Sequence, residues 1–318
     1  MTLHLTMTCG PYDRAKALID GSVKPEGIEL TVRVDDDDVG RQQRAARGEF
    51  DICEFFTGAY IADVPFKRLG FTALPIFVKR MFRHSYIYIN RNSGIHTPRD
   101  LNGKRVGVQT WITSAAVWAK GMLEDEHDVD LASIDWVEWQ PVRIPDWKPP
   151  AWLNLSSRHQ GKSQFDLLAS GQIDAAITTE IWAPNVHPGI DFLFPDHGKV
   201  EREYFRRTAC FPIMHTLLVR NKILDANPWV ARSLYDAWQE SKLRCYQQQQ
   251  WDRIHKTSLW YRDLWEEERR VAGDDIYVWG FNKTRHELEV MLRYAYRQGL
   301  TPRPVAPEEL FWPSMLET

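Results

Sequence analysis

Two arginines and a histidine, Arg80, Arg83 and His84, lie within five residues of one another. A guanidinium can hold a carboxylate through two parallel hydrogen bonds, and an imidazole exchanges a proton near neutral pH. The alternating aromatic and aliphatic residues up to Asn90 predict a buried β-strand with these cations at its mouth. The run therefore predicts a site that binds and protonates a carboxylate-bearing ligand. The alternative is that the arginines are solvated and the histidine only ends a strand.

Three further candidates follow predicted strands. Arg14 lies in the first turn of a predicted helix after a strand at 3–8, where free backbone N–H groups favour anions. Glu54 ends a short buried strand, and Glu180 lies beyond another strand at 173–177. Ligands of open α/β sheets bind at the carboxyl ends of strands, so both glutamates are placed to face a ligand. An exposed helix arginine and a helix-capping glutamate are the structural alternatives.

Neutral hydrogen-bond donors begin the helix that is predicted after the strand at 106–108. These are Thr113 and Ser114, which would add to an anion site or serve as plain helix caps. A second histidine, His215, stands at the head of an apolar strand, as His84 does. The sequence therefore offers two imidazoles in the same context, and the spacing alone does not choose between them.

Composition and charge narrow the class of protein. The 318 residues include 43% hydrophobic residues, 14 Trp, 11 Tyr and 14 Phe, which are enough for two cores and for flat walls around an aromatic ligand. A net charge of -3 disfavours a nucleic-acid or membrane-surface partner. The first ten residues lack the pattern of a secretory signal, and no stretch is long and apolar enough to span a membrane.

The cysteines agree with a reducing compartment. Cys9, Cys53, Cys210 and Cys245 are widely scattered and show neither a C-x-x-C motif nor zinc-ligand spacing. We therefore expect a cytoplasmic protein, although a mature protein whose signal has been removed would have the same sequence. The oligomeric state is left open by the sequence, a homo-oligomer included.

Strands and helices alternate along the chain, which is typical of α/β folds. A turn-rich stretch at 93–103 precedes a new strand, and the strand at 216–220 returns to the first domain. We therefore predict one lobe from residues 1–90 and 216–318 and a second lobe from 91–215. The Pro/Trp-rich stretch 141–152 predicts a long loop. Its Arg143, Trp147 and Trp152 either cover a ligand or belong to a surface insertion.

Several short sequence motifs resemble those of known families. Three of them resemble type II periplasmic-binding-protein folds, which have two α/β lobes and a ligand cleft between them: Gly48-x-Phe50-Asp51, Asp100-Leu101-x-Gly103-Lys104 and Gly171-x-Ile173-Asp174-Ala175. More specific phrases resemble the 4,5-dihydroxyphthalate decarboxylase family, an enzymatic branch of that fold: Cys9-Gly10-Pro11-Tyr12-Asp13-Arg14, Phe82-Arg83-His84-Ser85, Thr113-x-Ala115-x-Val117-Trp118, Phe211-Pro212-Ile213-Met214-His215 and Pro228-Trp229-Val230-Ala231. Together with Gln298-Gly299-Leu300 and Glu309-Leu310-Phe311 they span almost the whole chain. Thr110-Trp111-Ile112 departs from the family, which tends to place a Tyr or another polar residue there.

The resemblance implies a non-oxidative decarboxylation of a hydroxylated aromatic dicarboxylate, most specifically 4,5-dihydroxyphthalate to protocatechuate and CO2. Protonation of the ring carbon, aided by a hydroxyl para to the departing carboxylate, avoids an aryl carbanion. We expect His84 to be the acid, with His215 as the alternate. Glu54, Glu180 or the remaining histidine would engage the hydroxyls.

The carboxylate that stays on the ring needs cations. We assign this role to Arg14, Arg80 and Arg83, assisted by Thr113 and Ser114. An apolar slot of Phe82, Trp111 and Tyr12 would receive the departing CO2.

Two other functions and a metal remain alternatives at this stage. The fold also suits a solute-binding protein for an aromatic carboxylate without catalysis, or another lyase that acts on a carboxylated ring. A divalent metal held by the two histidines and the two glutamates is less favoured than a metal-free cleft, because no H-x-H or H-E-x-x-H spacing is present. We therefore expect no cofactor and a small aromatic carboxylate as the partner.

Overall fold

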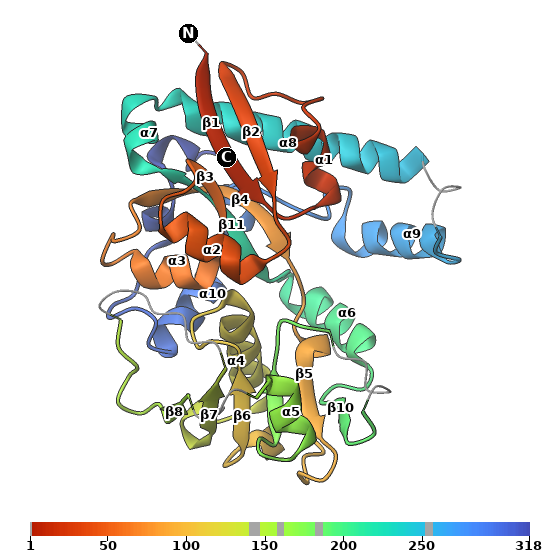
Figure 1. Ribbon diagram of the computed structural model, residues 1–318. Helices are drawn as coiled ribbons and strands as arrows, with labels where there is room; N and C mark the ends of the chain where they lie inside the picture. Colours follow the sequence, from red (N-terminus) through yellow and green to blue (C-terminus); the bar gives the residue numbers. More distant parts are fainter. Residues whose placement is uncertain (1, 140–146, 158–161, 182–186, 252–256) are drawn as a thin grey trace.

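Two β-sheets, each covered by helices, form two lobes in the computed structural model (Figure 1). The structure describes residues 2–139, 147–157, 162–181, 187–251 and 257–318. The first sheet contains β1 (Leu3–Cys9), β2 (Ile28–Val34), β3 (Ile52–Phe56), β4 (Phe71–Arg80) and β11 (Ile213–Arg220). The second contains β5 (Ile87–Asn90), β6 (Arg105–Val108), β7 (Asp135–Glu138), β8 (Leu155–Ser156), β9 (Ala175–Ile177) and β10 (Ile190–Phe192). These two sheets confirm the predicted α/β class.

The first sheet has the strand order β2-β1-β3-β11-β4. β1 pairs in parallel with β2 and β3, whereas β11 inserts antiparallel between β3 and β4. Seven of the eight residues of β11 are buried, as expected for a central strand covered on both faces. The insertion brings His215 of β11 opposite Phe56 of β3 and Lys79 of β4. Residues from three distant parts of the chain thus meet at one end of this sheet.

The chain crosses between the lobes twice, and the first crossing lies earlier than residue 90. β4 ends at Arg80, and β5 pairs antiparallel with both β9 and β10 in the second sheet. A 3-10 turn at His84–Tyr86 separates β4 from β5, so the strand predicted up to Asn90 forms as β5 with the predicted cations before it. The second crossing enters β11, close to the predicted return at 216.

Ten helices are described, and they cover both sheets. They are α1 (Lys16–Ile19), α2 (Asp38–Ala46), α3 (Thr57–Asp63), α4 (Ser114–His127), α5 (Gln164–Ala169), α6 (His197–Thr208), α7 (Asn221–Ala226), α8 (Trp229–Trp251), α9 (Tyr261–Ala272) and α10 (Arg285–Arg297). α2 and α3 pack against the first sheet, whereas α5 packs against the second. Within the described ranges, none of the helices combines the length and the apolarity that crossing a bilayer requires. All four cysteines are buried, and none of them forms a disulfide.

The lobes touch where α3 meets the start of α4. The backbone N–H of Gly58 donates to Ser114 Oγ at 2.9 Å, and Ser114 Oγ donates to the carbonyl of Met214 at 2.5 Å. A Cβ at position 58 would lie 2.5 Å from the carbonyl oxygen of Ile112, which is too close for any side chain. α10 packs against both α3 and α4, so it bridges the same junction (Figure 1). These contacts join the two lobes on this side of the space between them.

Candidate active site

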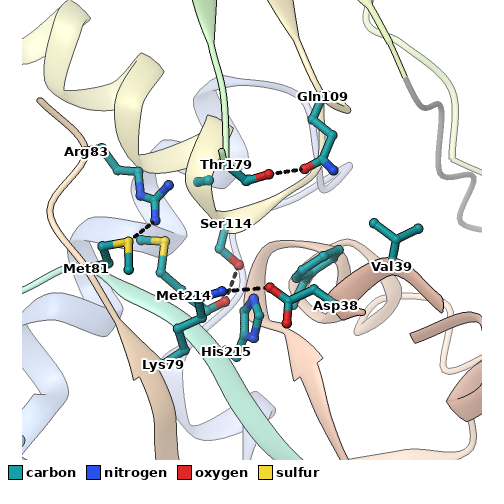
Figure 2. A pocket seen from close by; sticks show the side chains of 12 residues that line it. Asp38, Val39, Lys79, Met81, Arg83, Gln109, Ser114, Thr179, Met214 and His215 are labelled. Carbon is teal, nitrogen blue, oxygen red and sulfur yellow. Dashed lines mark hydrogen bonds and ion pairs between the residues drawn. The ribbon is translucent and has the colours of Figure 1, made fainter. Parts of the chain in front are cut away.

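A cavity between the lobes encloses about 440 Å³ of space that atoms do not fill, part of it open to solvent. Figure 2 shows that its walls come from both lobes and from the first crossing. The first lobe contributes Asp38, Lys79 and His215, the second contributes Gln109 and Ser114, and the crossing contributes Arg83. The cavity thus combines cations, a carboxylate and an imidazole in one place.

His215 and Glu54 form a buried pair behind this cavity wall. Nδ1 of His215 hydrogen bonds to Oε1 of Glu54 across the β3–β11 pairing. Glu54 is fully buried, and it also accepts from the Gly10 N–H at 2.8 Å and the Tyr12 hydroxyl at 2.6 Å. Burial raises the pKa of Glu54, but His215 and Arg41 outweigh that effect and hold the pKa at about 2. Glu54 is therefore an anion at neutral pH.

The charge on Glu54 fixes the tautomer of His215. An ionised carboxylate only accepts hydrogen bonds, so we assign the imidazole proton to Nδ1 and the free lone pair to Nε2. Burial lowers the pKa of His215, opposed by its bond to Glu54, so the imidazole is neutral near pH 7. His215 can therefore accept a proton through Nε2, while Glu54 stabilises the imidazolium that forms.

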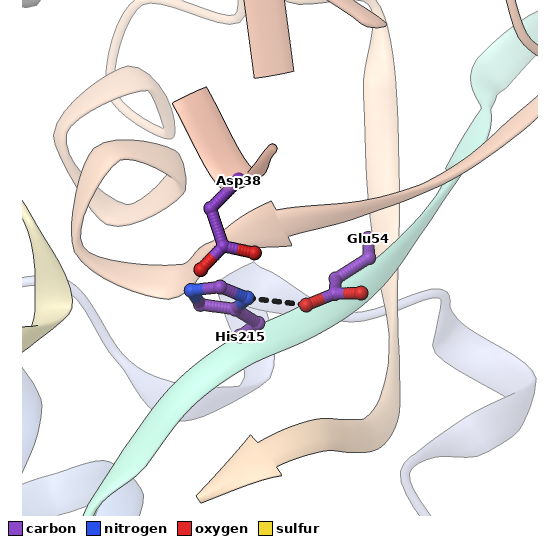
Figure 3. A group of neighbouring side chains, drawn as sticks. All are labelled: Asp38, Glu54 and His215. Atoms are coloured by element: carbon purple, nitrogen blue, oxygen red, sulfur yellow. Dashed lines mark hydrogen bonds and ion pairs between the residues drawn. The ribbon is translucent and has the colours of Figure 1, made fainter. Parts of the chain in front are cut away.

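Asp38 lies on the other side of the imidazole (Figure 3). One oxygen of Asp38 and one atom each of His215 and Glu54 lie within 4.8 Å of one another. Asp38 accepts from Lys79 Nζ at 2.6 Å and from Arg41, whose guanidinium also contacts Glu54 at 3.0 Å. Burial raises the pKa of Asp38, but His215, Lys79 and Arg41 together hold it at about 2. Two carboxylates and two cations therefore surround the neutral imidazole.

Arg83 faces this group across the cavity (Figure 2). Its side chain is buried, its Nη2 donates to Met81 Sδ at 2.9 Å, and its guanidinium stacks 4.4 Å from the Tyr86 ring. Nε and Nη1 have no hydrogen-bond partner among the described residues. Burial lowers the pKa of Arg83 to about 10. A buried guanidinium with two unpartnered nitrogen donors has the chemistry to bind an anion.

Two residues of the cavity, Asp38 and Lys79, were not predicted from the sequence. The run Asp35–Asp38 has the composition of a solvated turn, but Asp38 begins α2, which is capped by Asp37 accepting from Gly40 N–H at 2.9 Å. Because α2 begins at this residue, the Asp38 side chain points toward β4 and contacts Lys79 there. Lys79 lies near the end of β4, where strand alternation could have indicated the face on which it lies.

His84, expected as the acid, lies away from the cavity. It is buried on the 3-10 turn, with its ring centroid 5.3 Å from those of both Phe194 and Tyr204. Burial lowers its pKa to about 4, and Nδ1 has no partner among the described residues. Of the two histidines predicted as candidates, only His215 lines the cavity.

The two other predicted cations are held by the protein itself. Arg80 is buried, and it contacts Glu287 at 2.5 Å and the carbonyls of Phe211 and Val278. Arg14 donates to the Val78 carbonyl through Nε at 3.0 Å, and its guanidinium lies over the rings of Tyr12 and Tyr277. Neither arginine lines the cavity. Of the three predicted arginines, the structure brings only Arg83 to it.

Among the remaining candidates, one lines the cavity and the others do not. Ser114 lines the cavity, whereas Thr113 caps α4 by accepting from the Ala116 N–H at 3.4 Å. Trp111 is fully buried and donates to the Gln298 carbonyl at 3.0 Å. Glu180 is exposed.

The expected CO2 slot does not form, because Phe82, Trp111 and Tyr12 lie apart. Phe82 lines a different groove, and Tyr12 donates to Glu54. In the stretch 141–152, Trp147 donates to the Gly299 carbonyl at 2.9 Å, whereas Arg143 lies outside the described residues.

Asp38, Glu54 and His215 have the residue types of a metal site, but their surroundings do not fit one. Glu54 Oε1 already meets Tyr12, Arg41 and His215, and Oε2 meets a backbone N–H. Both carboxylates are neutralised by Arg41 or Lys79. A divalent cation would have to displace these cations and resist their repulsion. His84 and Glu180, the other predicted ligands, are not part of this group.

A larger groove between α6 and α9 suits a dianion less well. It holds about 1280 Å³ of space that atoms do not fill, part of it open to solvent. Its apolar wall includes Phe205 and Leu264. Glu201, Glu267 and Glu268 also line it, and Arg202 is engaged with Glu267 at 3.0 Å. The negative rim would repel a carboxylate, so the cavity at His215 is the candidate active site.

The comparisons with known proteins point to one family. The chain is 33% identical to the 4,5-dihydroxyphthalate decarboxylase of Comamonas testosteroni over 326 aligned residues, covering 99% of this chain and 98% of that protein. The chain belongs to the 4,5-dihydroxyphthalate decarboxylase family. A protein of the same name from Pseudomonas putida is 29% identical, covering 64% of this chain and 82% of its own. No protein-family model matches the chain.

Solved structures confirm the fold of this decarboxylase-family chain. The ligand-binding component of an ABC-type import system from Staphylococcus aureus has a TM-score of 0.54 at 12% identity, covering 99% of this chain and 98% of that one. The alkanesulfonate-binding protein of Xanthomonas axonopodis pv. citri has a TM-score of 0.53 at 13% identity, covering 97% and 98%. These likenesses show the two-lobed fold of solute-binding proteins, as the sequence predicted.

Proposed function

We propose that the chain is a carboxy-lyase that converts 4,5-dihydroxyphthalate to protocatechuate and CO2 in the cavity at His215. Membership of the decarboxylase family supports the activity. The observation that carries the assignment to this cavity is the pairing of Arg83, a buried guanidinium with free donors, with a neutral imidazole on the facing wall. This arrangement suits a ring with carboxylates at one edge and hydroxyls at the other.

Arg83 binds the carboxylate edge of the ring. Its two free donors form charge-assisted hydrogen bonds, and their burial strengthens them relative to the same bonds in water. Ser114 lies on the same cavity, and its hydroxyl is already committed to Met214. Because the guanidinium is fixed before the ligand arrives, binding orients the ring without reorganising the wall.

His215 accepts the proton of the hydroxyl para to the departing carboxylate. The resulting phenolate moves charge to the ring carbon that carries that carboxylate. That carbon takes up one proton, supplied by solvent, to which the cavity is open. The C–C bond then breaks, CO2 leaves as aromaticity returns, and His215 gives its proton back to the phenolate oxygen. Glu54 holds the imidazole in the required tautomer throughout.

Incubation with 4,5-dihydroxyphthalate tests this function. We expect equimolar CO2 and protocatechuate, detected by gas analysis and chromatography, and a rate that falls by at least about 100-fold in His215→Asn. His286→Asn is the matched control, because His286 bonds to the Thr208 carbonyl away from the cavity. Tight binding of the substrate without CO2 release would instead indicate a solute-binding protein. We also propose that the protein acts in phthalate degradation in the cytoplasm.

A further inference from the structure

One wall of the cavity, the acceptor wall, carries Asp38 and His215 together with Lys79, whose ammonium is bound to Asp38, and the facing donor wall carries Arg83. On the acceptor wall, Asp38 is ionised and Nε2 of His215 carries a lone pair. On the donor wall, Nε and Nη1 of Arg83 have no partner among the described residues. A bound ligand must therefore bring acceptors to one wall and donors to the other.

The acceptor wall is incomplete without a ligand that donates hydrogen bonds. Asp38 and the imidazole lie side by side, with an oxygen of Asp38 within 4.8 Å of a ring nitrogen (Figure 3). No hydrogen bond joins them in the described structure, because both groups are acceptors at this point. A carboxylate facing an imidazole lone pair is unfavourable unless protons lie between them or hydroxyls occupy both.

Asp38 has acceptor capacity to spare. A carboxylate offers about four lone-pair sites, and Asp38 uses one oxygen for Arg41 and the other for Lys79. Its side chain is 30% exposed, so a ligand in the cavity can reach it. Lys79 and Arg41 also keep the carboxylate ionised, which prevents it from becoming a donor.

We propose that Asp38 and His215 together bind the two adjacent hydroxyls of an ortho-diphenol, so that Asp38 selects diols over ligands with one hydroxyl. This inference rests on the proposed function for the placement of the carboxylates at Arg83. His215 takes the hydroxyl para to the carboxylate that leaves. Asp38 takes the neighbouring hydroxyl, which is para to the carboxylate that stays. In protocatechuate these two groups are the 3-hydroxyl and the 4-hydroxyl.

The affinities of three unreactive acids distinguish the contact at His215 from the contact at Asp38. Benzoate, 3-hydroxybenzoate and 3,4-dihydroxybenzoate share one carboxylate and add the hydroxyls one at a time. Titration calorimetry on the wild-type protein should show the diol binding about tenfold or more tightly than 3-hydroxybenzoate, as a hydrogen bond to a charged acceptor predicts. A wild-type protein that does not prefer the diol would overturn the inference.

The Asp38→Asn variant should lose the gain in affinity that the second hydroxyl gives and keep the gain that the first hydroxyl gives. We expect its affinities for 3-hydroxybenzoate and 3,4-dihydroxybenzoate to differ by less than about threefold, while the gain from benzoate to 3-hydroxybenzoate persists. Asp36→Asn is the matched control in the same acidic run, since Asp36 is exposed. Equal loss of affinity for all three acids would mean that Asp38 only supports the fold, and it would overturn the inference.

A measurement on the wild-type protein alone covers the case in which the variant does not fold. 3,4-Dihydroxybenzenesulfonate should displace bound 3-hydroxybenzoate at a concentration about tenfold lower than 3-hydroxybenzenesulfonate does; equal potency would contradict diol selection. The proposed function fails separately, if wild-type protein releases no CO2 from 4,5-dihydroxyphthalate while the diol preference is present.

Discussion

Replacement of Arg83 by Met should make the protein more stable and nearly inactive at once. The guanidinium is buried, and burial lowers the pKa of Arg83 to about 10. Since one pH unit corresponds to about 1.4 kcal/mol, keeping this charge inside the folded protein costs about 3 kcal/mol. A methionine of similar length removes the charge and both unpartnered donors. We therefore expect the free energy of unfolding to rise by about 1–3 kcal/mol.

The same substitution removes the anchor for the substrate carboxylate. Truncation of one partner in a buried charged pair typically costs about 2–5 kcal/mol of binding, so KM should rise by at least about 30-fold. Urea unfolding and steady-state kinetics measure the two effects on one preparation. Added phthalate should stabilise the wild-type protein by mass action and leave Arg83→Met unchanged.

Arg99→Met is the matched control, because Arg99 is exposed and its replacement should alter neither quantity. The reasoning is refuted if Arg83→Met is less stable than the wild type and keeps its KM. That result would mean that the guanidinium serves the fold, as Arg80 does through Glu287.

Three further outcomes follow from the pairs around His215 and from the position of His84. His84→Leu should keep kcat within about threefold, because a neutral imidazole among aromatic rings does not reach the cavity; a loss of 100-fold would restore His84 as the acid. Glu54→Gln should lower kcat by at least about 100-fold with little change in phthalate binding, since an amide can donate to Nδ1 and reverse the tautomer. The depressed pKa values of Glu54 and Asp38 stabilise the fold above the unfolded value near 4, so the free energy of unfolding should fall as the pH drops from about 4 to about 2. Glu54→Gln should show a smaller fall, and an identical curve would contradict the assignment.

The alternation of strands and helices was sufficient to predict the fold class. Local patterns predicted β1, β3 and the return of the chain through β11, because each is a short apolar run bounded by turns. The strand predicted up to Asn90 is β5, but its pattern did not reveal that β5 belongs to the second sheet and not to the first. Sheet membership depends on pairing partners that are distant in sequence, and a single strand does not specify them.

The candidate site was predictable in part. Glu54, His215 and Arg83 were selected because each lies at a strand end or in a cationic run, and the structure brings all three to the same cavity, with His215 and Arg83 on facing walls and Glu54 directly behind His215. The roles of other arginines could not be inferred from sequence, because their partners are remote. The carboxylate that holds Arg80 lies 207 residues away in the sequence, on Glu287. Asp38 was missed for the converse reason, since an acidic run is usually a solvated turn.

A crystal structure of the His215→Asn variant with 4,5-dihydroxyphthalate tests the central claim most directly. We expect the ring in the cavity between the lobes, with one carboxylate on Nε and Nη1 of Arg83 and the hydroxyl edge toward Asp38 and position 215. A ring bound in the groove between α6 and α9, or a reversed ring with its carboxylates at Asp38, would contradict the account.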